Sequence, residues 1–212
     1  MNFNNADGAA ILTALVKAIQ DNKQYLSDID GLIGDGDHGI NMNKGFTIFS
    51  EQLAAGPVSF SQGLGMLSKT LMTKIGGSMG PLYGFLFKNM ALACDGVEAI
   101  DAAVFGKMMT ACKEGIQKVS QAQVGDKTLM DVLVPAEQAY QSALQDGNNF
   151  SECLDAMAAA AVQGRDATKD MIAKVGRSSR LGERSRGVID AGSASCCLIL
   201  ETIAAGIKGI LK

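Results

Sequence analysis

The chain has 212 residues, 47% of them hydrophobic, and we expect residues 1–212 to form a single domain around one sizeable core. Tryptophan is absent, aromatic residues make up 5% and only 3 prolines occur, a balance that favours an all-α fold over a β-sandwich. The net charge of -3 supplies no general basic field for nucleic acid or an anionic membrane, so any anion site must be local.

Apolar residues at three- and four-residue steps predict eight helices along the chain. The first helix follows Asp7, a residue type that often caps helices. The predicted ranges are 7–26, 38–53, 60–75, 80–94, 101–120, 127–146, 151–175 and 192–211. Pro135 should bend the sixth helix or mark an irregular turn in it, and Gly164 weakens the middle of the seventh.

Short connections between most of these helices predict antiparallel neighbours in an up-and-down bundle. The loops after helices one, three, five and seven then lie at the same end. Three of them are unusual, namely the acidic stretch 28–39, the glycine-rich stretch 75–81 and the long basic stretch 176–192, and the loop that ends in GDKT joins them. Long loops without regular structure are usually functional or disordered, so this end of the bundle is the predicted site.

The five cysteines lie in apolar helical patterns without C-x-x-C spacing, which indicates buried free thiols rather than a zinc site or a redox pair. The first residues, MNFNNADGAA, lack the features of a signal peptide, and no apolar run approaches the roughly 18 residues that span a bilayer. We therefore expect a cytoplasmic protein that binds no membrane.

The acidic stretch DIDGLIGDGDHGINMNKGF contains Asp30, Asp35 and Asp37, with glycines that would let a loop fold back and bring the carboxylates together. Two unit charges about 4 Å apart repel by roughly 4 kcal/mol at an effective dielectric of 20, so the cluster needs a cation, protonation or wide spacing. Oxygen ligands favour magnesium or calcium, and the calcium-loop motif fails because Leu32 and Gly39 fall at its third ligand position. Magnesium is the predicted metal, and a solvated turn of aspartates and glycines remains the alternative.

The other unusual loops carry groups that bind phosphate. Gly76, Gly77 and Ser78 precede a helix whose first amides could hold a phosphate, although Gly-Gly-Ser is also an ordinary turn. The basic stretch carries Arg177, Arg180, Arg184 and Arg186 against Glu183 and Asp190. Guanidinium groups pair well with phosphate, but a solvated or internally paired loop fits the same residues. His38 would bind phosphate or cap the following helix, and no pattern supports it as a nucleophile. Together, these groups predict a magnesium-nucleotide site.

Four ordered motifs, IGDGDHGINMNKGF, GGSMGPLYG, GDKTLMDVLVPA and GRSSRLGERSRGVIDAG, closely resemble the L subunit of bacterial dihydroxyacetone kinases, which is the nucleotide-binding subunit. The resemblance spans nearly the full length of the chain. It implies a closed barrel of eight antiparallel helices that binds ADP or ATP and two magnesium ions at one end. The helix count and the shared loop end reached above agree with that architecture.

The resemblance also implies roles for individual residues. By motif, Asp30, Asp35 and Asp37 match the magnesium ligands, and Arg177 matches a catalytic arginine that stabilises charge on the moving phosphoryl group. The implied nucleotide-binding positions are His38, Gly39, Ile40, Asn41, Ser78, Met79, Leu129, Arg177, Asp190, Ala191 and Gly192. Three residues depart from the family's pattern, namely Met79 for a frequent serine, Arg180 for a frequent tyrosine and Ala191 for a frequent proline. These changes bear on phosphate contact and loop stiffness.

In this family a separate K subunit holds the sugar as a covalent hemiaminal on a histidine. The resemblance therefore implies that the chain delivers a phosphoryl group to a short ketose on that subunit. The nucleotide would be resident ADP, rephosphorylated by the M subunit of the phosphoenolpyruvate phosphotransferase system, or exchanging ATP, and a free-standing L subunit fits resident ADP better. A four-carbon ketose or a carrier-bound fatty acid is an alternative acceptor, and a nucleotide-occupied regulatory module is an alternative of another class. A homodimer is left open.

Overall fold

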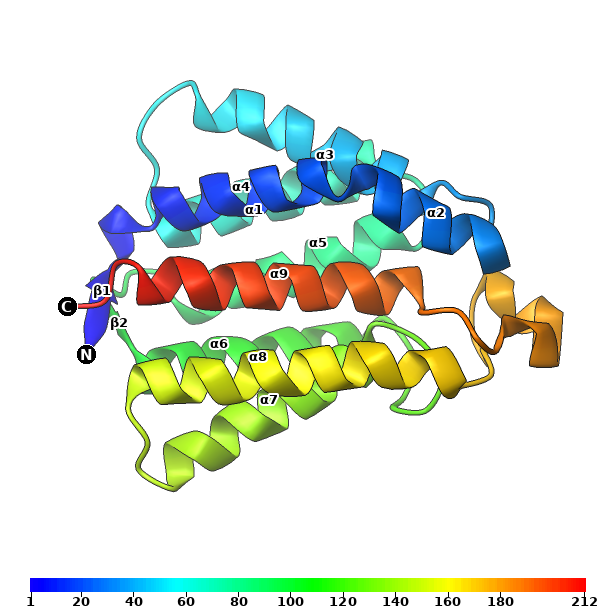
Figure 1. Ribbon diagram of the computed structural model, residues 1–212. Helices are drawn as coiled ribbons and strands as arrows, with labels where there is room; N and C mark the ends of the chain where they lie inside the picture. Colours follow the sequence, from blue (N-terminus) through cyan, green and yellow to red (C-terminus); the bar gives the residue numbers. More distant parts are fainter.

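The structure is a computed structural model that describes residues 1–212, and it is almost entirely helical (Figure 1). The α-helices are α1 (Ala9–Asp21), α2 (Lys23–Ile33), α3 (His38–Leu53), α4 (Phe60–Lys74), α5 (Met79–Ala93), α6 (Ala102–Gln117), α7 (Met130–Gln145), α8 (Phe150–Ala167) and α9 (Ala191–Lys208). The short elements are the strands β1 (Asn2–Asn4) and β2 (Ala99–Asp101) and the 3-10 segments η1 (Asn5–Asp7), η2 (Thr168–Asp170) and η3 (Arg177–Ser185). The predicted all-α class is confirmed.

The helices pack side by side in a ring. From α3 onward each helix contacts the next one along the chain, and α9 returns to contact α1, which itself packs on α3. Both chain termini lie at one end of the molecule, next to the antiparallel pair β1–β2, and η3 lies at the opposite end (Figure 1). Successive long helices therefore alternate in direction, as the short connections predict.

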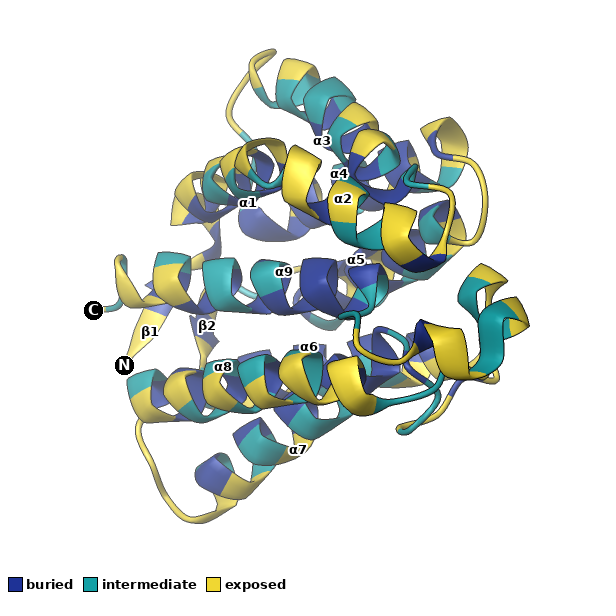
Figure 2. Cartoon of the chain, turned by 45° about the vertical axis from the view of Figure 1, so that its right-hand side comes forward, coloured by how far each residue is buried: buried dark blue, intermediate teal, exposed yellow.

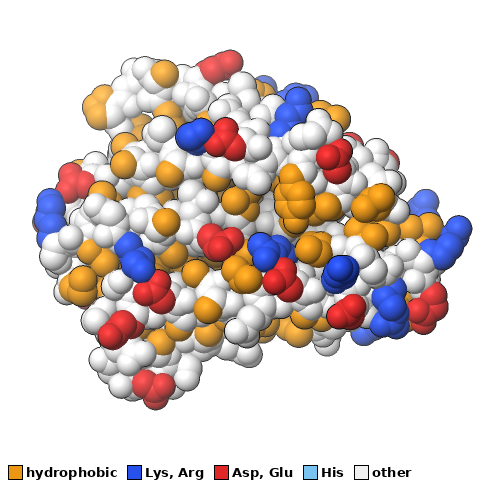
Figure 3. All heavy atoms as spheres, viewed as in Figure 1, with side chains coloured by type: hydrophobic (Ala, Val, Ile, Leu, Met, Phe, Trp, Pro, Cys, Tyr) orange, Lys and Arg blue, Asp and Glu red, His pale blue; other side chains and the backbone are white.

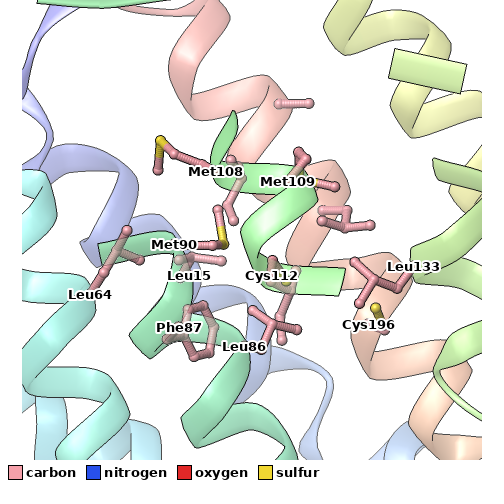
Figure 4. Packing of buried hydrophobic residues seen from close by; sticks show 14 of the residues in the cluster. Leu15, Leu64, Leu86, Phe87, Met90, Met108, Met109, Cys112, Leu133 and Cys196 are labelled. Atoms are coloured by element: carbon pink, nitrogen blue, oxygen red, sulfur yellow. The ribbon is translucent and has the colours of Figure 1, made fainter. Parts of the chain in front are cut away.

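The core is one cluster of 48 buried hydrophobic residues in the middle of this ring. Figure 4 shows Leu15 from α1, Phe87 from α5, Met109 from α6 and Cys196 from α9 meeting there. The five cysteines are buried free thiols, as predicted. The helices turn their exposed residues outward, as Figure 2 shows. Helix α9 is long and apolar enough to cross a membrane by composition, but 61% of it is buried inside the protein, as befits a core helix.

The first predicted helix is in fact two, and the second of them runs through the stretch predicted as an acidic loop. Helix α1 ends at Asp21, and α2 continues from Lys23 to Ile33. Leu26 and Ile33 are buried and Ile29 packs against the core, so an apolar stripe at three- and four-residue steps carries the helix past its glycine. The true loop is only the four residues 34–37.

Other helix ends also differ from the predicted ones. The seventh helix stops at Ala167 rather than near 175, because the Thr168 hydroxyl turns back to the Arg165 carbonyl at 2.6 Å and also accepts the Asp190 N–H at 3.1 Å. The predicted cap at Asp7 is wrong, since α1 begins after Gly8 without a side-chain cap. Pro135 lies inside α7, which stays helical throughout.

Candidate functional site

The four unusual loops meet around one cavity of about 540 Å³ at the end of the ring opposite the termini. Its walls come from the α2–α3 junction, the start of α5, the α6–α7 loop, the segment just before η3 and the start of α9. This convergence is the one predicted from the alternating direction of the helices. Because each wall comes from a different part of the chain, the ring itself sets the distances between them.

The three predicted carboxylates come together at the α2–α3 junction. Asp30 lies on the last turn of α2, Asp35 lies in the loop, and Asp37 immediately precedes α3. One carboxylate oxygen from each lies within 4.8 Å of the others. Asp37 occupies the N-cap position of α3, yet its side chain makes no capping hydrogen bond, so its oxygens are left for another partner.

The backbone of this junction allows the close approach. Gly36 has a φ of +75°, a left-handed conformation that glycine adopts without steric cost. A Cβ on Gly34 would overlap the Asp30 carboxylate. The Asp30 carboxylate also accepts the His38 N–H at 3.3 Å, which fixes it against the start of α3. The glycines thus allow the three carboxylates to approach one another. The candidate metal ligands are all carboxylate oxygens, which magnesium prefers.

Arg177 lies across the cavity mouth at the start of η3 and forms an ion pair with Asp35. Both side chains are exposed, so their charges remain accessible to a ligand. Figure 3 shows further Lys and Arg side chains at this end of the molecule. Arg180 does not line the cavity, and Arg186 instead binds Glu183 and the Asp170 carbonyl outside it.

Two helix starts face the cavity besides α3. Ser78 and Met79 begin α5, and the Ser78 side chain makes no capping hydrogen bond. Helix α9 begins at Ala191, after Asp190 caps it by accepting the Ser193 N–H at 2.7 Å. Partial burial raises the pKa of the Asp190 carboxyl to about 6, against the opposing effect of the hydrogen bonds from Ser193. Main-chain N–H groups at these helix starts favour an anion in the cavity.

The cavity floor contains a buried hydrogen-bond network around His38. The His38 Nε2 atom lies 2.8 Å from the Ser195 hydroxyl, which is 2.6 Å from the Tyr83 hydroxyl. Tyr83 in turn donates to the Gly192 carbonyl at 3.0 Å, so the network joins α3, α5 and α9. Burial lowers the pKa of His38 to about 4, and the imidazole is therefore neutral at pH 7.

Most of the sequence-predicted residues line the cavity, but three do not. The three aspartates, His38, Ser78, Met79, Leu129, Arg177, Asp190, Ala191 and Gly192 line it, whereas Gly39, Ile40 and Asn41 do not. Gly39 is a packing residue, because a Cβ there would overlap the Lys23 carbonyl of α2. Ile40 is 54% exposed. All three residues lie on the first turn of α3.

Sequence reasoning missed several polar residues of the cavity and its floor, among them Tyr83, Lys127, Thr128 and Ser195. Tyr83 and Lys127 lie within the motifs GGSMGPLYG and GDKTLMDVLVPA, so the motif matches contained them without marking them as polar contributors to the cavity. Ser195 had no such signal, since it lies in an apolar helix and acts through partners on two other helices.

Residues 32–205 match the family described as DAK2 domain. The chain is 40% identical to the PEP-dependent dihydroxyacetone kinase 1, ADP-binding subunit DhaL of Listeria innocua over 189 residues, 87% of this chain and 88% of the relative. It is 39% identical to the PTS-dependent dihydroxyacetone kinase, ADP-binding subunit DhaL of Lactococcus lactis, with the same coverage of both chains.

Among solved structures, the dihydroxyacetone kinase from C. freundii in complex with AMP-PNP and Mg2+ is similar in fold. The TM-score is 0.71 at 20% sequence identity, and the match covers 97% of this chain and 34% of that larger protein. The match over residues 32–205 and the two relatives at about 40% identity show the family: the chain belongs to the DAK2 domain family.

Proposed function

We propose that this chain is the nucleotide-binding subunit of a dihydroxyacetone-type kinase. In this role it carries ADP or ATP with magnesium and transfers a phosphoryl group to a short ketose held on a separate K subunit. The observation that carries the proposal is that three carboxylates, the start of α5 and Arg177 surround one cavity. The printed names of the Listeria and Lactococcus relatives, both ADP-binding subunits of dihydroxyacetone kinases, support the same conclusion.

Asp30, Asp35 and Asp37 fit magnesium because they offer three oxygen ligands within 4.8 Å of one another on a backbone that glycines shape. Bound there, two magnesium ions would neutralise charge on the nucleotide phosphates and orient them. The C. freundii structure that shares the fold was solved with AMP-PNP and Mg2+, which is compatible with this assignment.

The other cavity residues divide into phosphate and base contacts. Main-chain N–H groups at Ser78 and Met79, and those of Gly39 and Ile40 in the first turn of α3, would bind the phosphates. The neighbouring N–H groups of His38 and Asn41 already donate to Asp30 and Asp37. Leu129 is buried at the opposite wall and offers the base an apolar contact. The segment from Asp190 to Gly192 lies beside Leu129, since a Cβ on Gly192 would be 3.6 Å from the Leu129 nitrogen, and it would close over the nucleotide.

Arg177 has the catalytic role in this proposal. Its guanidinium lies at the cavity mouth, on the exposed side, where an acceptor on another protein would approach. It would stabilise charge on the phosphoryl group as that group moves from nucleotide to sugar. Val119 and Val175 are exposed apolar residues that also line the cavity, and they offer a docking partner an apolar contact.

The phosphoryl donor is proposed to be the phosphoenolpyruvate phosphotransferase system, acting through its M subunit on ADP that stays bound. The printed names of the Listeria and Lactococcus relatives support this donor, because one is called PEP-dependent and the other PTS-dependent. We place the reaction in the cytoplasm, where that system delivers phosphate. ATP exchange and a four-carbon ketose acceptor are the alternative donor and acceptor within the same chemistry.

Mass analysis of the purified protein for bound nucleotide tests the proposal, followed by incubation with the K subunit, ketose and either ATP or the phosphotransfer proteins. We expect copurified ADP and sugar phosphorylation that depends on the phosphotransfer proteins. If the bound nucleotide exchanges with free ATP and turnover needs none of those proteins, ATP is the phosphoryl donor instead. Retained nucleotide without transfer to dihydroxyacetone or a four-carbon ketose would instead identify a regulatory module.

A further inference from the structure

We propose that Lys127 is a positioning residue. It holds the segment that carries Arg177, residues 171–188, in place for phosphoryl transfer. The inference rests on the proposed function for its catalytic consequence, but its structural part stands alone. Lys127 belongs to the α6–α7 loop, whereas Arg177 lies between α8 and α9. The two residues belong to different walls of the same cavity.

The Lys127 ammonium joins the two ends of the Arg177 segment. It donates to the Met171 carbonyl at 3.2 Å, at the start of the segment, and to the Ser185 and Val188 carbonyls at 2.6 Å each, at its end. An ammonium has three N–H donors, so all three are used. Lys127 therefore ties together both ends of the segment between Met171 and Val188, which contains η3 and is drawn in orange in Figure 1.

Other hydrogen bonds join the same two ends, among them one from the Arg186 guanidinium to the Asp170 carbonyl. The Ala173 N–H donates to the Ser185 hydroxyl at 2.9 Å, and the Gly187 N–H donates to the Lys169 carbonyl at 2.7 Å. The outer part of the segment, from Gly176 to Arg184, is exposed or half-buried (Figure 2) and touches the ring at α2 and through the Arg177–Asp35 ion pair. The two ends of the segment are fixed at its base, where Lys127 lies.

The turn that carries Lys127 is itself rigidly built. Lys127 has a φ of +61°, an uncommon conformation for a residue with a Cβ. The Asp131 carboxylate, on the first turn of α7, accepts the Gly125 N–H at 2.5 Å and the Thr128 N–H at 2.7 Å on either side of it. Strain of this kind persists only where the surroundings demand it, and here it aims the lysine inward.

A direct role on the phosphate is disfavoured by burial. Lys127 is 1% exposed and forms no ion pair with a carboxylate, so the three carbonyl oxygens are its direct partners. Burial lowers the pKa of its ammonium, while Asp190 acts in the opposite direction. With every donor engaged, reaching a phosphate would require releasing the segment that the lysine holds.

Limited trypsin digestion tests the structural part without nucleotide or partner. In Lys127→Met we expect cleavage after the arginines of η3 to accelerate by at least about tenfold, since digestion follows local opening. Lys113→Met is the matched control, because it breaks the partly buried ion pair with Glu137 between α6 and α7, away from the segment. Unchanged cleavage in Lys127→Met, or equal acceleration in the control, would overturn the proposal. If Lys127→Met lacks helical content, Lys127→Gln takes its place under the same criteria.

A double-mutant cycle tests the catalytic part. If Lys127 acts through Arg177, Lys127→Met slows transfer by about tenfold or more with nucleotide affinity nearly unchanged, and it adds no further loss to Arg177→Ala. Multiplied effects in the double variant would show that Lys127 acts independently, which would contradict the inference. If the wild-type protein itself transfers no phosphate, the proposed function fails, and the digestion comparison still decides whether Lys127 holds the segment.

Discussion

Asp35 and Arg177 carry the two opposite charges that face each other at the cavity mouth. An ion pair between exposed side chains contributes little stability, about 0–1 kcal/mol, so either partner can exchange it for a ligand at small cost. This matters for the proposed chemistry, because the carboxylate has to bind metal and the guanidinium has to follow a phosphoryl group. Substitution at either residue should therefore change binding or turnover and leave the fold intact.

Asp35→Ala is predicted to lose magnesium-dependent nucleotide binding by about a hundredfold or more while keeping full helical content, because one of three carboxylate ligands disappears. Asp28→Ala is the matched control, since Asp28 is an exposed carboxylate on α2 that accepts a hydrogen bond from Gln24. Isothermal titration with ADP, with and without magnesium, measures the effect. Equal affinity of the Asp35 variant and the wild type would remove Asp35 from the metal site.

Arg177→Ala is predicted to bind ADP nearly as well as the wild type but to transfer phosphate about a hundredfold more slowly, because the missing charge matters most in the transition state. Arg180→Ala, one turn further along η3 and outside the cavity, is the control. A reconstituted assay with saturating nucleotide separates the two effects. Wild-type turnover in the Arg177 variant would end its catalytic assignment.

His38 is the only histidine, so its proton resonances report its titration directly. In the metal-free protein we predict a pKa of about 4, because burial disfavours the charged ring. The unfolded chain then takes up a proton near pH 6.5 and the folded protein does not, so the free energy of unfolding falls as pH drops from about 6.5 to 4, by about 3 kcal/mol in total. Nuclear magnetic resonance, with urea unfolding of wild type against His38→Gln, checks both. Titration near pH 6.5 would refute the buried state.

At the scale of helices, periodicity predicted the elements well and their ends poorly. The apolar steps of α3, α4, α5 and α9 appear in the sequence as they do in the structure. Helix α2 was missed because glycines and aspartates surround the apolar stripe of Leu26, Ile29 and Ile33. These three residues stabilise a helix only when they pack against the neighbouring helices. Burial against neighbouring helices outweighs the local cost of one glycine, about 1 kcal/mol.

Helices α7 and α8 approach closely at Gly164, and this contact supports the turn that carries Lys127. A Cβ on Gly164 would overlap the Asp131 carbonyl and lie 3.1 Å from the Val132 Cα, atoms of a helix backbone that cannot easily move. Gly164→Ala should therefore destabilise the protein by about 1–3 kcal/mol. Gly65→Ala in α4, where nothing lies within 4 Å, should stabilise it by up to about 1 kcal/mol. Urea unfolding measures both, and shifts of the same sign would contradict the packing argument.

At the scale of the whole molecule, the shared end of four loops was predictable because short connections force neighbouring helices to alternate. The contacts within that end were not. Lys127 binds carbonyls 44, 58 and 61 positions away, and Ser195 meets His38 across 157 positions, so no local pattern contains either arrangement. The four motifs contain most of the residues that line the cavity, whereas the contacts that hold those motifs in place emerged only from the fold.

The most direct test of the whole account is the anomalous signal of manganese in crystals grown with ADP and Mn2+, a substitute for magnesium at oxygen-rich sites. The account predicts peaks bounded by the carboxylates of Asp30, Asp35 and Asp37, with metal–oxygen distances of roughly 2.0–2.3 Å and the diphosphate on the far side of the metal. No peak among these carboxylates, with nucleotide bound elsewhere or not at all, would contradict it.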